Sequence, residues 1–379
     1  MTRSLPRLLI HVTAVVLVLA GAAVAIASRS DADEPPPAKP LAQAVNDALS
    51  APRPEGVSGR IEFSNRLVDA AAVPQGGENP LLSGASGRFW VAGDGRARLE
   101  LQSPAGDAQV RLDGDRIELY DPATNTAYVG DVPLGKLGED RGPLGLQRML
   151  ARLTRGFDLS EAEPGTVAGK AAYTVRIAPR HDGGLLGAAE VAWDAAHGLP
   201  LRAAVYAQGE REPVLEVKAT ELDFGPVAES DVAIRRPADA KVVEIEDDAG
   251  TPSGHQRMGK RAAANAVQAE LPFELAAPHA VAGLPRRSIR TLRSGDDTGA
   301  LVTYGKGLGA LMVIQMPAHD SGLARSGAPG LQELSIDGTT AHELATALGT
   351  IVQFERDGVS YTVIGSVPPA AAEAAARAL

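Results

Sequence analysis

The 379-residue chain contains no cysteine. It can therefore form neither disulfides nor thiolate metal sites, and it has no cysteine nucleophile and no cysteine to be acylated as in a bacterial lipoprotein. Any attachment to a membrane is expected to depend on an apolar helix. Positive charge is also in deficit, since the formal net charge is -10. Nucleic-acid binding requires a concentrated basic surface, so we expect no nucleic-acid partner.

The local signatures of common catalytic and metal sites are missing as well. The histidines are scattered, and in the nearest approach to a zinc motif, which starts at His342-Glu343, Thr346 stands where the second histidine would be. Serine never occurs in Gly-x-Ser-x-Gly, although a triad assembled only in space would escape this test. The glycine-rich segment 305–309 lacks the Gly-Lys-Ser/Thr of a phosphate loop and is interpreted as a hairpin turn. We expect no enzyme, no metal and no cofactor.

A long apolar run opens the chain. Leu8 to Ala27 carries no formal charge and follows Arg3 and Arg7, whereas acidic residues predominate just downstream. Its length corresponds to about 30 Å of helix, and the charge asymmetry orients the N-terminus toward the cytoplasm. Because Ala25-Ile26-Ala27 also resembles a peptidase site, residues 1–30 are either a cleaved signal peptide or an uncleaved anchor. The folded part is thus expected outside the cytoplasmic membrane, anchored or secreted.

The chain after this run alternates between short helical and strand patterns. Residues 31–40 are charged and proline-rich, which predicts an extended spacer rather than packed structure. Apolar residues from Leu41 to Leu49 recur at helical spacing. From Val57 to about Val132, segments of alternating polarity joined by turn dipeptides predict an antiparallel meander. Leu146, Met149, Leu150 and Leu153 then mark a helix whose apolar stripe would cover the apolar face of that meander.

A second group of strands is predicted to extend the same sheet, making it long enough to curl. Next come acidic and then Gly-rich and basic residues with little to bury, which indicates a linker. The expected division is a spacer (31–40), a first domain (41–246), a linker (247–264) and a small α+β domain (265–379). The added strands of the first domain are Ala171 to Ile177, Glu190 to Trp193, Leu199 to Tyr206 and Val214 to Asp223.

The small domain is predicted to combine strands with two helices. One helix is expected over Thr340 to Leu348, and a terminal helix from Pro369 to Leu379, where proline suits the first turn. The Asp357-Gly358 pair predicts a hairpin turn. The expected strands are Ser288 to Leu292, Ala300 to Tyr304, Leu311 to Gln315, Gln332 to Ile336, Ile351 to Arg356 and Val359 to Ile364.

Two surfaces have a functional interpretation beside a structural one. Four arginines within eight residues are either a solvated strand edge, or a contact for an anionic lipid head group or an acidic protein partner. The apolar face of the first sheet is either core, or the wall of a cleft that holds an acyl chain. The arginines are Arg286, Arg287, Arg290 and Arg293. The candidate lipid-binding residues are Phe89, Leu99, Leu101, Val110, Leu112, Ile117, Leu119, Leu146, Met149, Leu150 and Leu153.

Several short motifs of the first domain resemble those of a known family. They are residues 87–91, 96–100, 113–114 and 117–122, which look like its central strands, residues 193–194 and 198–202, which look like its late hairpin, and residues 223–227 and 236–238, which resemble its closing segment. The family is the LolA-like family of lipoprotein carriers, with the related first domain of RseB/MucB-type sigma-factor regulators. The excess of arginine over lysine and the C-terminal segment from Gly349 also look actinobacterial.

The resemblance implies a fold and two functions. The fold is a curved antiparallel half-barrel covered by helices, followed by a small C-terminal α+β domain. The first function is non-enzymatic binding of lipid or lipoprotein acyl chains, as a carrier or a tethered sensor. The alternative is a regulator that binds the outer segment of a membrane anti-sigma factor. An uncleaved anchor and a second domain both favour a tethered binder over a diffusing carrier.

Overall fold

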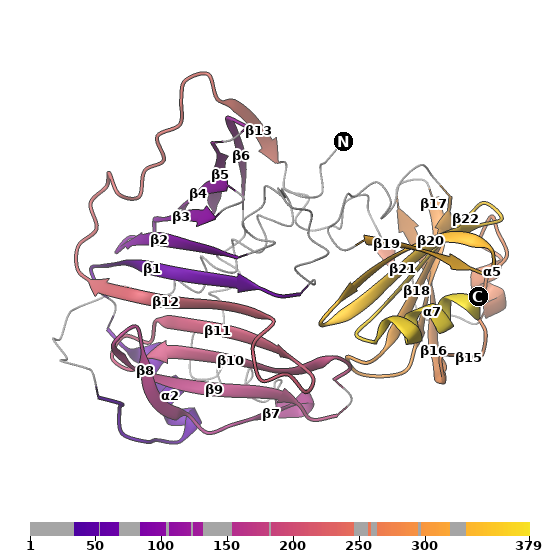
Figure 1. Ribbon diagram of the computed structural model, residues 1–379, viewed down its shortest axis with the longest axis horizontal. Helices are drawn as coiled ribbons and strands as arrows, with labels where there is room; N and C mark the ends of the chain where they lie inside the picture. The colour runs from indigo at the N-terminus through magenta and orange to yellow at the C-terminus, as the bar shows by residue number, and fades with distance from the viewer. Residues whose placement is uncertain are drawn as a thin grey trace.

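The computed structural model describes residues 34–52, 54–67, 84–103, 106–122, 124–131, 154–181, 183–245, 257–258, 264–294, 297–318 and 331–379. These residues form two mainly antiparallel sheets that lie beside one another, each with its own core (Figure 1). The predicted leader (1–30) and most of the predicted linker (247–264) lie outside the described residues. Within the part of the chain that is described, no helix combines the length and apolar character needed to cross a membrane.

The first sheet is built from thirteen of the described strands. Its order is β13-β6-β5-β4-β3-β2-β1-β12-β11-β10-β9-β7, with β8 also paired to β9. The strands are β1 (Gly56–Asn65), β2 (Ala85–Ala92), β3 (Ala97–Ser103), β4 (Gly106–Asp113), β5 (Arg116–Asp121), β6 (Thr126–Asp131), β7 (Phe157–Leu159), β8 (Glu163–Val167), β9 (Lys170–Pro179), β10 (Leu186–Asp194), β11 (Pro200–Ala207), β12 (Leu215–Phe224) and β13 (Lys241–Ile245).

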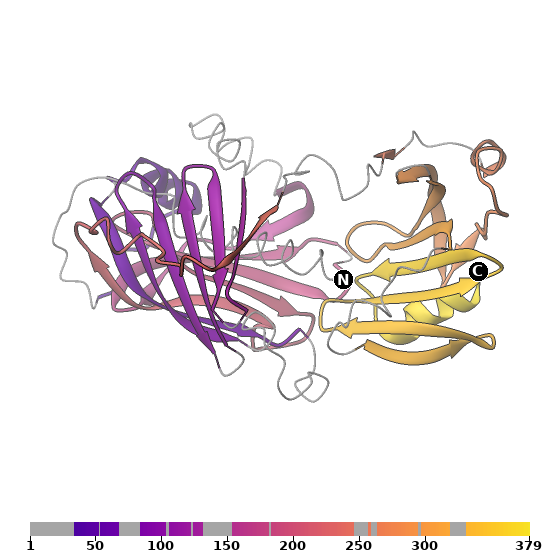
Figure 2. The same cartoon turned by 90° about the horizontal axis from the view of Figure 1, so that it is seen from above.

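The sheet is the predicted curved antiparallel meander, extended by the second group of strands. β12 pairs with β1, and this pairing joins the two groups into one sheet that curls along its length (Figure 2). The expected turn at Asp113 and Gly114 connects β4 to β5, and Gly114 has a φ of 60°. This conformation strains residues that carry a Cβ atom, which explains the glycine.

Glycines within the strands allow large side chains to lie across the sheet. Gly59 of β1 pairs with Phe89 of β2, and a Cβ at Gly59 would lie 3.0 Å from the Phe89 ring. Gly87 of β2 likewise pairs with Leu101, whose methyl group would lie 3.1 Å from an added Cβ. A missing side chain on one strand thus makes room for a bulky one on its neighbour.

The segment between β12 and β13 leads from the middle of the first sheet to its edge beside β6. It runs across the outside of the early strands (Figure 2), buries Val232 to 1% exposure and pairs Arg236 with Glu118 at 2.6 Å. It ends in β13, which pairs with β6 and is parallel to it. Glu244 lies in β13 and forms an ion pair with Arg116 at 3.0 Å.

The predicted first helix is confirmed as α2 (Leu41–Ser50). Its apolar residues pack on β9 and β10, where Tyr173 and Trp193 are buried with Ala44. The end of the preceding spacer is extended, as expected, but it is not free of the fold. The carbonyl of Pro37 accepts a hydrogen bond from the Tyr173 hydroxyl at 2.7 Å, and the backbone of Lys39 forms an isolated antiparallel β-bridge with Ala162. The charged composition of the spacer predicted solvation and did not reveal these backbone contacts.

The second sheet is built from nine of the described strands. Its order is β14-β16-β17-β18-β22-β21-β20-β19, with β15 paired to β16. The elements are β14 (Arg257–Met258), α5 (Ala264–Gln268), β15 (Ala280–Val281), β16 (Leu284–Ser294), β17 (Asp297–Tyr304), β18 (Leu311–Pro317), β19 (Leu331–Ile336), β20 (Thr339–Thr346), β21 (Gly349–Arg356), β22 (Val359–Gly365) and α7 (Pro369–Arg377).

Most predicted elements of this region are confirmed, and one is wrong. The hairpin at Asp357-Gly358 joins β21 to β22, and the terminal helix is α7. The expected helix over Thr340 to Leu348 is instead the strand β20, which pairs with β19 and β21. Ala341 and Glu343 alternate inward along it, so pairing on both sides outweighs the helix propensity of Ala, Glu and Leu.

Two glutamines, the fully buried Gln315 and the half-buried Gln268, hold the segment between α5 and β15. The Gln315 side chain donates to the carbonyl of Ala276 at 2.7 Å and accepts from its amide at 2.9 Å. Gln268 binds Phe273 and Leu275 in the same way. Each amide side chain satisfies backbone groups that the segment would otherwise bury without partners.

Tyr304 is fully buried in the same core, and its hydroxyl has no hydrogen-bond partner among the described residues. Burial raises the pKa of this hydroxyl to about 12. Tyr304→Phe removes the unsatisfied group and is expected to raise the free energy of unfolding by about 1 kcal/mol. Amide hydrogen exchange in β17 and β18 measures this change. Tyr206→Phe is the contrasting variant, since the Tyr206 hydroxyl is hydrogen-bonded; a loss of stability in Tyr304→Phe would contradict the prediction.

Candidate functional site: an apolar face and a polar face of one sheet

One face of the first sheet is lined by apolar side chains from strand to strand. Residues paired across antiparallel strands point to the same face, so the register traces the lining. Leu99 of β3 pairs with Phe89 of β2 and with Val110 of β4, which pairs with Leu119 of β5. Three further rows of residues, each paired from one strand to the next, line the same face. The first is Ile61, Gly87, Leu101 and Ala108, and the second is Val57, Val91, Ala97, Leu112 and Ile117. The third is Val175, Val191, Ala203, Val217 and Phe63. We call this surface the apolar face.

The structure brings together every described residue of the predicted lipid-binding set. Phe89, Leu99, Leu101, Val110, Leu112, Ile117 and Leu119 belong to one cluster and are at most 7% exposed. The other four, Leu146, Met149, Leu150 and Leu153, lie outside the described residues. The role of the set in binding stays a prediction.

The apolar face extends beyond the strands in which it was predicted. Leu201 of β11 and Leu222 of β12 belong to the same cluster as Leu99. Toward β9 and β10 the face continues under α2, where Val175 and Trp193 are buried. The alternation of Leu201 and Leu222 with polar residues was visible in the sequence, but only the pairing of β12 with β1 makes them neighbours of the early strands.

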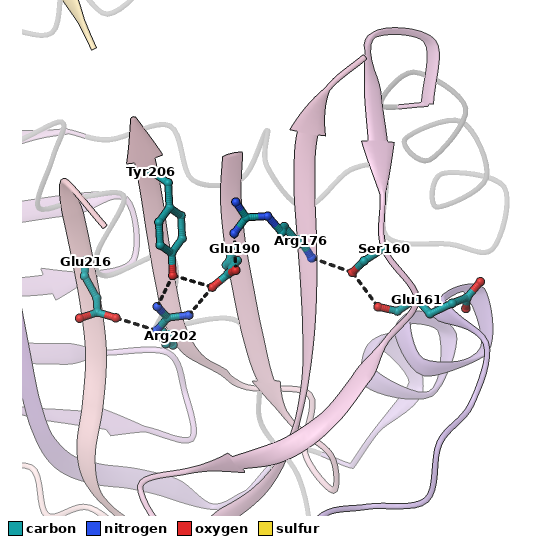
Figure 3. A network of polar contacts seen from close by, with 7 residues as sticks. All are labelled: Ser160, Glu161, Arg176, Glu190, Arg202, Tyr206 and Glu216. Atoms are coloured by element: carbon teal, nitrogen blue, oxygen red, sulfur yellow. Dashed lines mark hydrogen bonds and ion pairs between the residues drawn. The ribbon is translucent and has the colours of Figure 1, made fainter. Parts of the chain in front are cut away.

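The opposite face carries a polar network on β9 to β12 (Figure 3). The carboxylate of Glu190 accepts from Arg202 Nη1 at 2.8 Å, from the Tyr206 hydroxyl at 2.7 Å and from Arg176 Nη1 at 2.7 Å. Arg202 Nε donates to Glu216 at 2.6 Å. We call these five residues the polar network; no local pattern in the sequence predicts it.

Burial and hydrogen bonding act in opposite directions on the acidic member of the polar network. Burial alone raises the pKa of Glu190, but the hydrogen bonds from Arg202, Tyr206 and Arg176 outweigh it, so the pKa lies below its ordinary value. Burial opposes the charge of Arg202 too, yet its contacts with Glu190, Tyr206 and Glu216 raise its pKa. Every member has a partner, which indicates a structural element rather than a reactive centre.

The four predicted partner-binding arginines lie together on β16, but only two of them are unpaired. Arg286 donates to the carbonyl of Ala277, and Arg293 Nη2 forms an ion pair with Glu270 at 2.9 Å. Arg287 is exposed and Arg290 is half-buried, and within the described residues neither forms an ion pair. The predicted cluster therefore separates into two anchoring and two available arginines.

A buried carboxyl marks the second sheet. Glu343 of β20 is 5% exposed, and within the part of the chain that the structure describes its Oε2 atom has no hydrogen-bond partner. Burial and the nearby carboxylate of Glu373 on α7 raise the pKa of Glu343 above its ordinary value. In the sequence, this residue stands out only as part of a weak metal motif, together with His342. In the described part of the chain, no three His, Asp or Glu side chains are grouped to hold a metal.

The two sheets touch at the ends of their strands. The amide of Leu185 donates to Ser366 Oγ at 2.9 Å, and Ser366 Oγ donates to the carbonyl of Leu348 at 2.7 Å. The amide of Ala347 donates to the carbonyl of Leu67 at 2.8 Å. A pocket of about 750 Å³ lies beside this contact, with a mixed lining that includes Arg66, Leu185, Glu210, Arg211, Glu212, Pro213 and Ala347. No predicted site residue belongs to this pocket.

Comparison with known proteins gives structural matches alone. No protein-family model matches the chain, and no curated protein matches its sequence. The chain is similar to MucB in the solved MucA/MucB complex of Pseudomonas aeruginosa, with 19% identity, 89% of this chain and 96% of that chain covered, and a TM-score of 0.42.

Two further structures match about half of the chain at low identity. One is a putative outer membrane lipoprotein-sorting protein domain from Vibrio parahaemolyticus, with 12% identity, 50% and 95% coverage and a TM-score of 0.22. The other is a LolA superfamily protein from Nitrosomonas europaea, with 9% identity, 52% and 99% coverage and a TM-score of 0.24. All three TM-scores are below 0.5.

Proposed function

We propose that the protein is a non-enzymatic, extracytoplasmic binder of lipid or lipoprotein acyl chains, which it holds against the apolar face. The continuity of that face over the rows of paired residues is the observation that carries the proposal. An acyl chain needs a long apolar wall and no polar contact, because each buried CH₂ contributes about 0.8 kcal/mol. Tethering through Leu8 to Ala27 would make the protein a local sensor, and cleavage after Ala27 would make it a carrier.

Binding must compete with the present packing of the apolar face. Its central side chains are buried, with Val110 at 0% and Leu99 at 1% exposure. A ligand has to displace whatever covers these side chains, so only a ligand with many methylene groups offsets that cost. Long-chain lipids and acylated peptides meet this requirement better than short-chain molecules. We therefore expect affinity to rise with acyl length.

Titration with a fluorescent long-chain fatty acid tests the proposal. Leu101→Asp places a charge on the apolar face and is expected to weaken binding by at least about tenfold, or ~1.4 kcal/mol. Val110→Thr, which keeps the side-chain shape, is expected to weaken it less. Ser86→Asp adds the same charge on the exposed opposite face of β2 and should leave binding unchanged. Equal affinities for Leu101→Asp and Ser86→Asp, with both variants folded, would count against the proposal.

A second candidate function is a regulator that binds the outer segment of a membrane anti-sigma factor. The specific observation in its favour is the pair Arg287 and Arg290, which lack ion-pair partners within the described residues of an acidic chain. Affinity purification from membranes should then recover a single-span protein, and recovery of lipids alone would count against this function.

A further inference from the structure

Two neighbouring turns form one end of the second sheet. One turn joins β15 to β16, and the other, residues 305–310, joins β17 to β18. The amide of Gly305 donates to the carbonyl of Pro285 at 2.9 Å, which places the two turns side by side. The last residues paired between β17 and β18 are Tyr304 and Leu311. The second turn therefore projects beyond the paired strands.

The tip of this second turn carries a large apolar side chain. Leu308 is 45% exposed, and Lys306 beside it is exposed as well. On β18, directly after the turn, Met312 is 40% exposed. Among the described residues, the other large apolar side chains that are as exposed are Leu49 and Val242. Two of these four lie in one hairpin, which indicates a surface that contacts an apolar partner.

This end of the sheet is basic, although the chain is acidic. Residues 275–294 and 298–318 span β15, β16, β18 and all but the first residue of β17. They contain four arginines, one lysine and no acidic residue, so their formal charge is +5 in a chain of net charge -10. Arg287 and Lys306 are exposed beside the two turns, and Arg290 is half-buried. Among the described residues, none of these three forms an ion pair.

We propose that this end of the second sheet docks on an anionic membrane surface, where Leu308 enters the boundary between head groups and acyl chains, and Lys306 and Arg287 contact lipid phosphates. Interfacial binding combines the burial of apolar side chains with attraction between basic residues and anionic lipids. We call residues 282–287 and 305–312 the docking end. The proposal goes beyond the proposed function, because the acyl chains of that function bind on the first sheet.

A lipid surface fits the docking end better than an acidic polypeptide. Polypeptide ligands bind in grooves or along strand edges, whereas the turn at 305–310 projects from the end of the sheet. Charge alone would suit either partner, but a projecting turn buries Leu308 in a bilayer without a preformed pocket. The apolar run from Leu8 to Ala27 is predicted to hold the chain at a membrane, and such a tether raises the local concentration of lipid.

The test uses the full-length chain reconstituted in nanodiscs. Because the chain has no cysteine, Ala282→Cys places a single environment-sensitive fluorophore on the exposed first turn. With phosphatidylglycerol present, its emission should shift to the blue and be quenched by lipids that carry a nitroxide near the head group. Both effects should weaken with salt and be absent with phosphatidylcholine alone. A fluorophore at Glu355→Cys, at the opposite end of the sheet, should stay in water in both lipids.

Variants separate the apolar and the basic contributions. Leu308→Ser, and Lys306→Glu combined with Arg287→Glu, should each lower the ratio of docked to undocked protein by about tenfold or more. Leu49→Ser is the matched control, since it removes an exposed leucine from α2 of the first sheet, and it should have no effect. All of these side chains are exposed, so the core is unchanged, and hydrogen exchange in β17 and β18 checks that the variants are folded.

Three results would overturn the proposal: a fluorophore at residue 282 that stays in water on phosphatidylglycerol, docking that is equal on phosphatidylcholine, or docking that neither variant weakens. A peptide of alternating glutamate and valine that protects the fluorophore where lipid does not would also contradict it, and would assign the docking end to an acidic polypeptide.

Discussion

Glu190→Ala is expected to lower the free energy of unfolding of the first sheet by about 2–3 kcal/mol. Glu190 is the shared acceptor of Arg176, Arg202 and Tyr206, and its side chain is 18% exposed. Removal leaves a largely buried Arg202 with the single carboxylate of Glu216, and breaking one partner of a buried pair costs 3–5 kcal/mol when burial is complete. The residual exposure reduces this figure. Urea unfolding reports the change through the two tryptophans, Trp90 and Trp193.

The control for this variant is an exposed ion pair in the same sheet. Arg60 and Glu221 are paired at 2.9 Å but are 50% and 65% exposed. Glu221→Ala should therefore cost less than about 1 kcal/mol. Equal effects of the two substitutions would show that the polar network has no special stability.

The effect of Glu190 should also depend on pH, with a definite sign. Because the pKa of Glu190 is lowered in the folded protein, its ionised form contributes stability above the unfolded pKa. That contribution is lost as the pH falls through the folded pKa. The difference between wild type and Glu190→Ala should consequently shrink in acid.

Glu343→Gln is expected to stabilise the second sheet at pH 8 relative to wild type, by about 2 kcal/mol, and to have little effect near pH 4. Burial and Glu373 raise the pKa of Glu343, so the protonated form is favoured in the fold. The stability that this provides is present below the unfolded pKa and is lost as the pH rises through the folded pKa. A buried, unpaired carboxylate at high pH costs on the order of 1–3 kcal/mol. The amide of Gln does not ionise, which removes the pH dependence.

Among the described residues, no basic side chain forms an ion pair with Glu343. Glu373 of α7 faces it, and Arg377 is engaged by Glu373 at 2.9 Å. On the flanking strands its register partners are Gln332 of β19 and Val352 of β21. Hydrogen exchange of α7 and β20 from pH 4 to 8 measures the effect, with the exposed Glu333→Gln as the control. A wild-type stability that does not change with pH in this sheet would contradict the prediction.

Local sequence patterns predicted most elements, because alternation and turn residues are local signals. The strands around Asp113-Gly114 and Asp357-Gly358, and the helices α2 and α7, were found this way. β20 was not, since its residues have good helix propensity and only pairing with β19 and β21 makes them a strand. The contact of Pro37 with Tyr173 was missed because it joins residues 136 apart.

The candidate site could be predicted only in part, because local alternation does not specify which strands pair. Each leucine of the apolar face could be assigned to a face from alternation alone, but the union of early and late strands depends on the pairing of β1 with β12. The polar network joins Arg176, Glu190, Arg202 and Glu216 from four strands. Taken alone, each of these residues has the pattern of a solvent-facing charge on a strand, so nothing in the sequence indicated that they contact one another.

Native mass spectrometry of the full-length chain, extracted gently from the membrane in which it is made, tests the central claim most directly. We expect a bound species with the mass of a long-chain lipid or an acylated peptide, present in wild type and in Ser86→Asp and lost in Leu101→Asp. Protein that is always free of lipid, or lipid adducts that Leu101→Asp retains while still folded, would contradict the claim that the apolar face holds acyl chains.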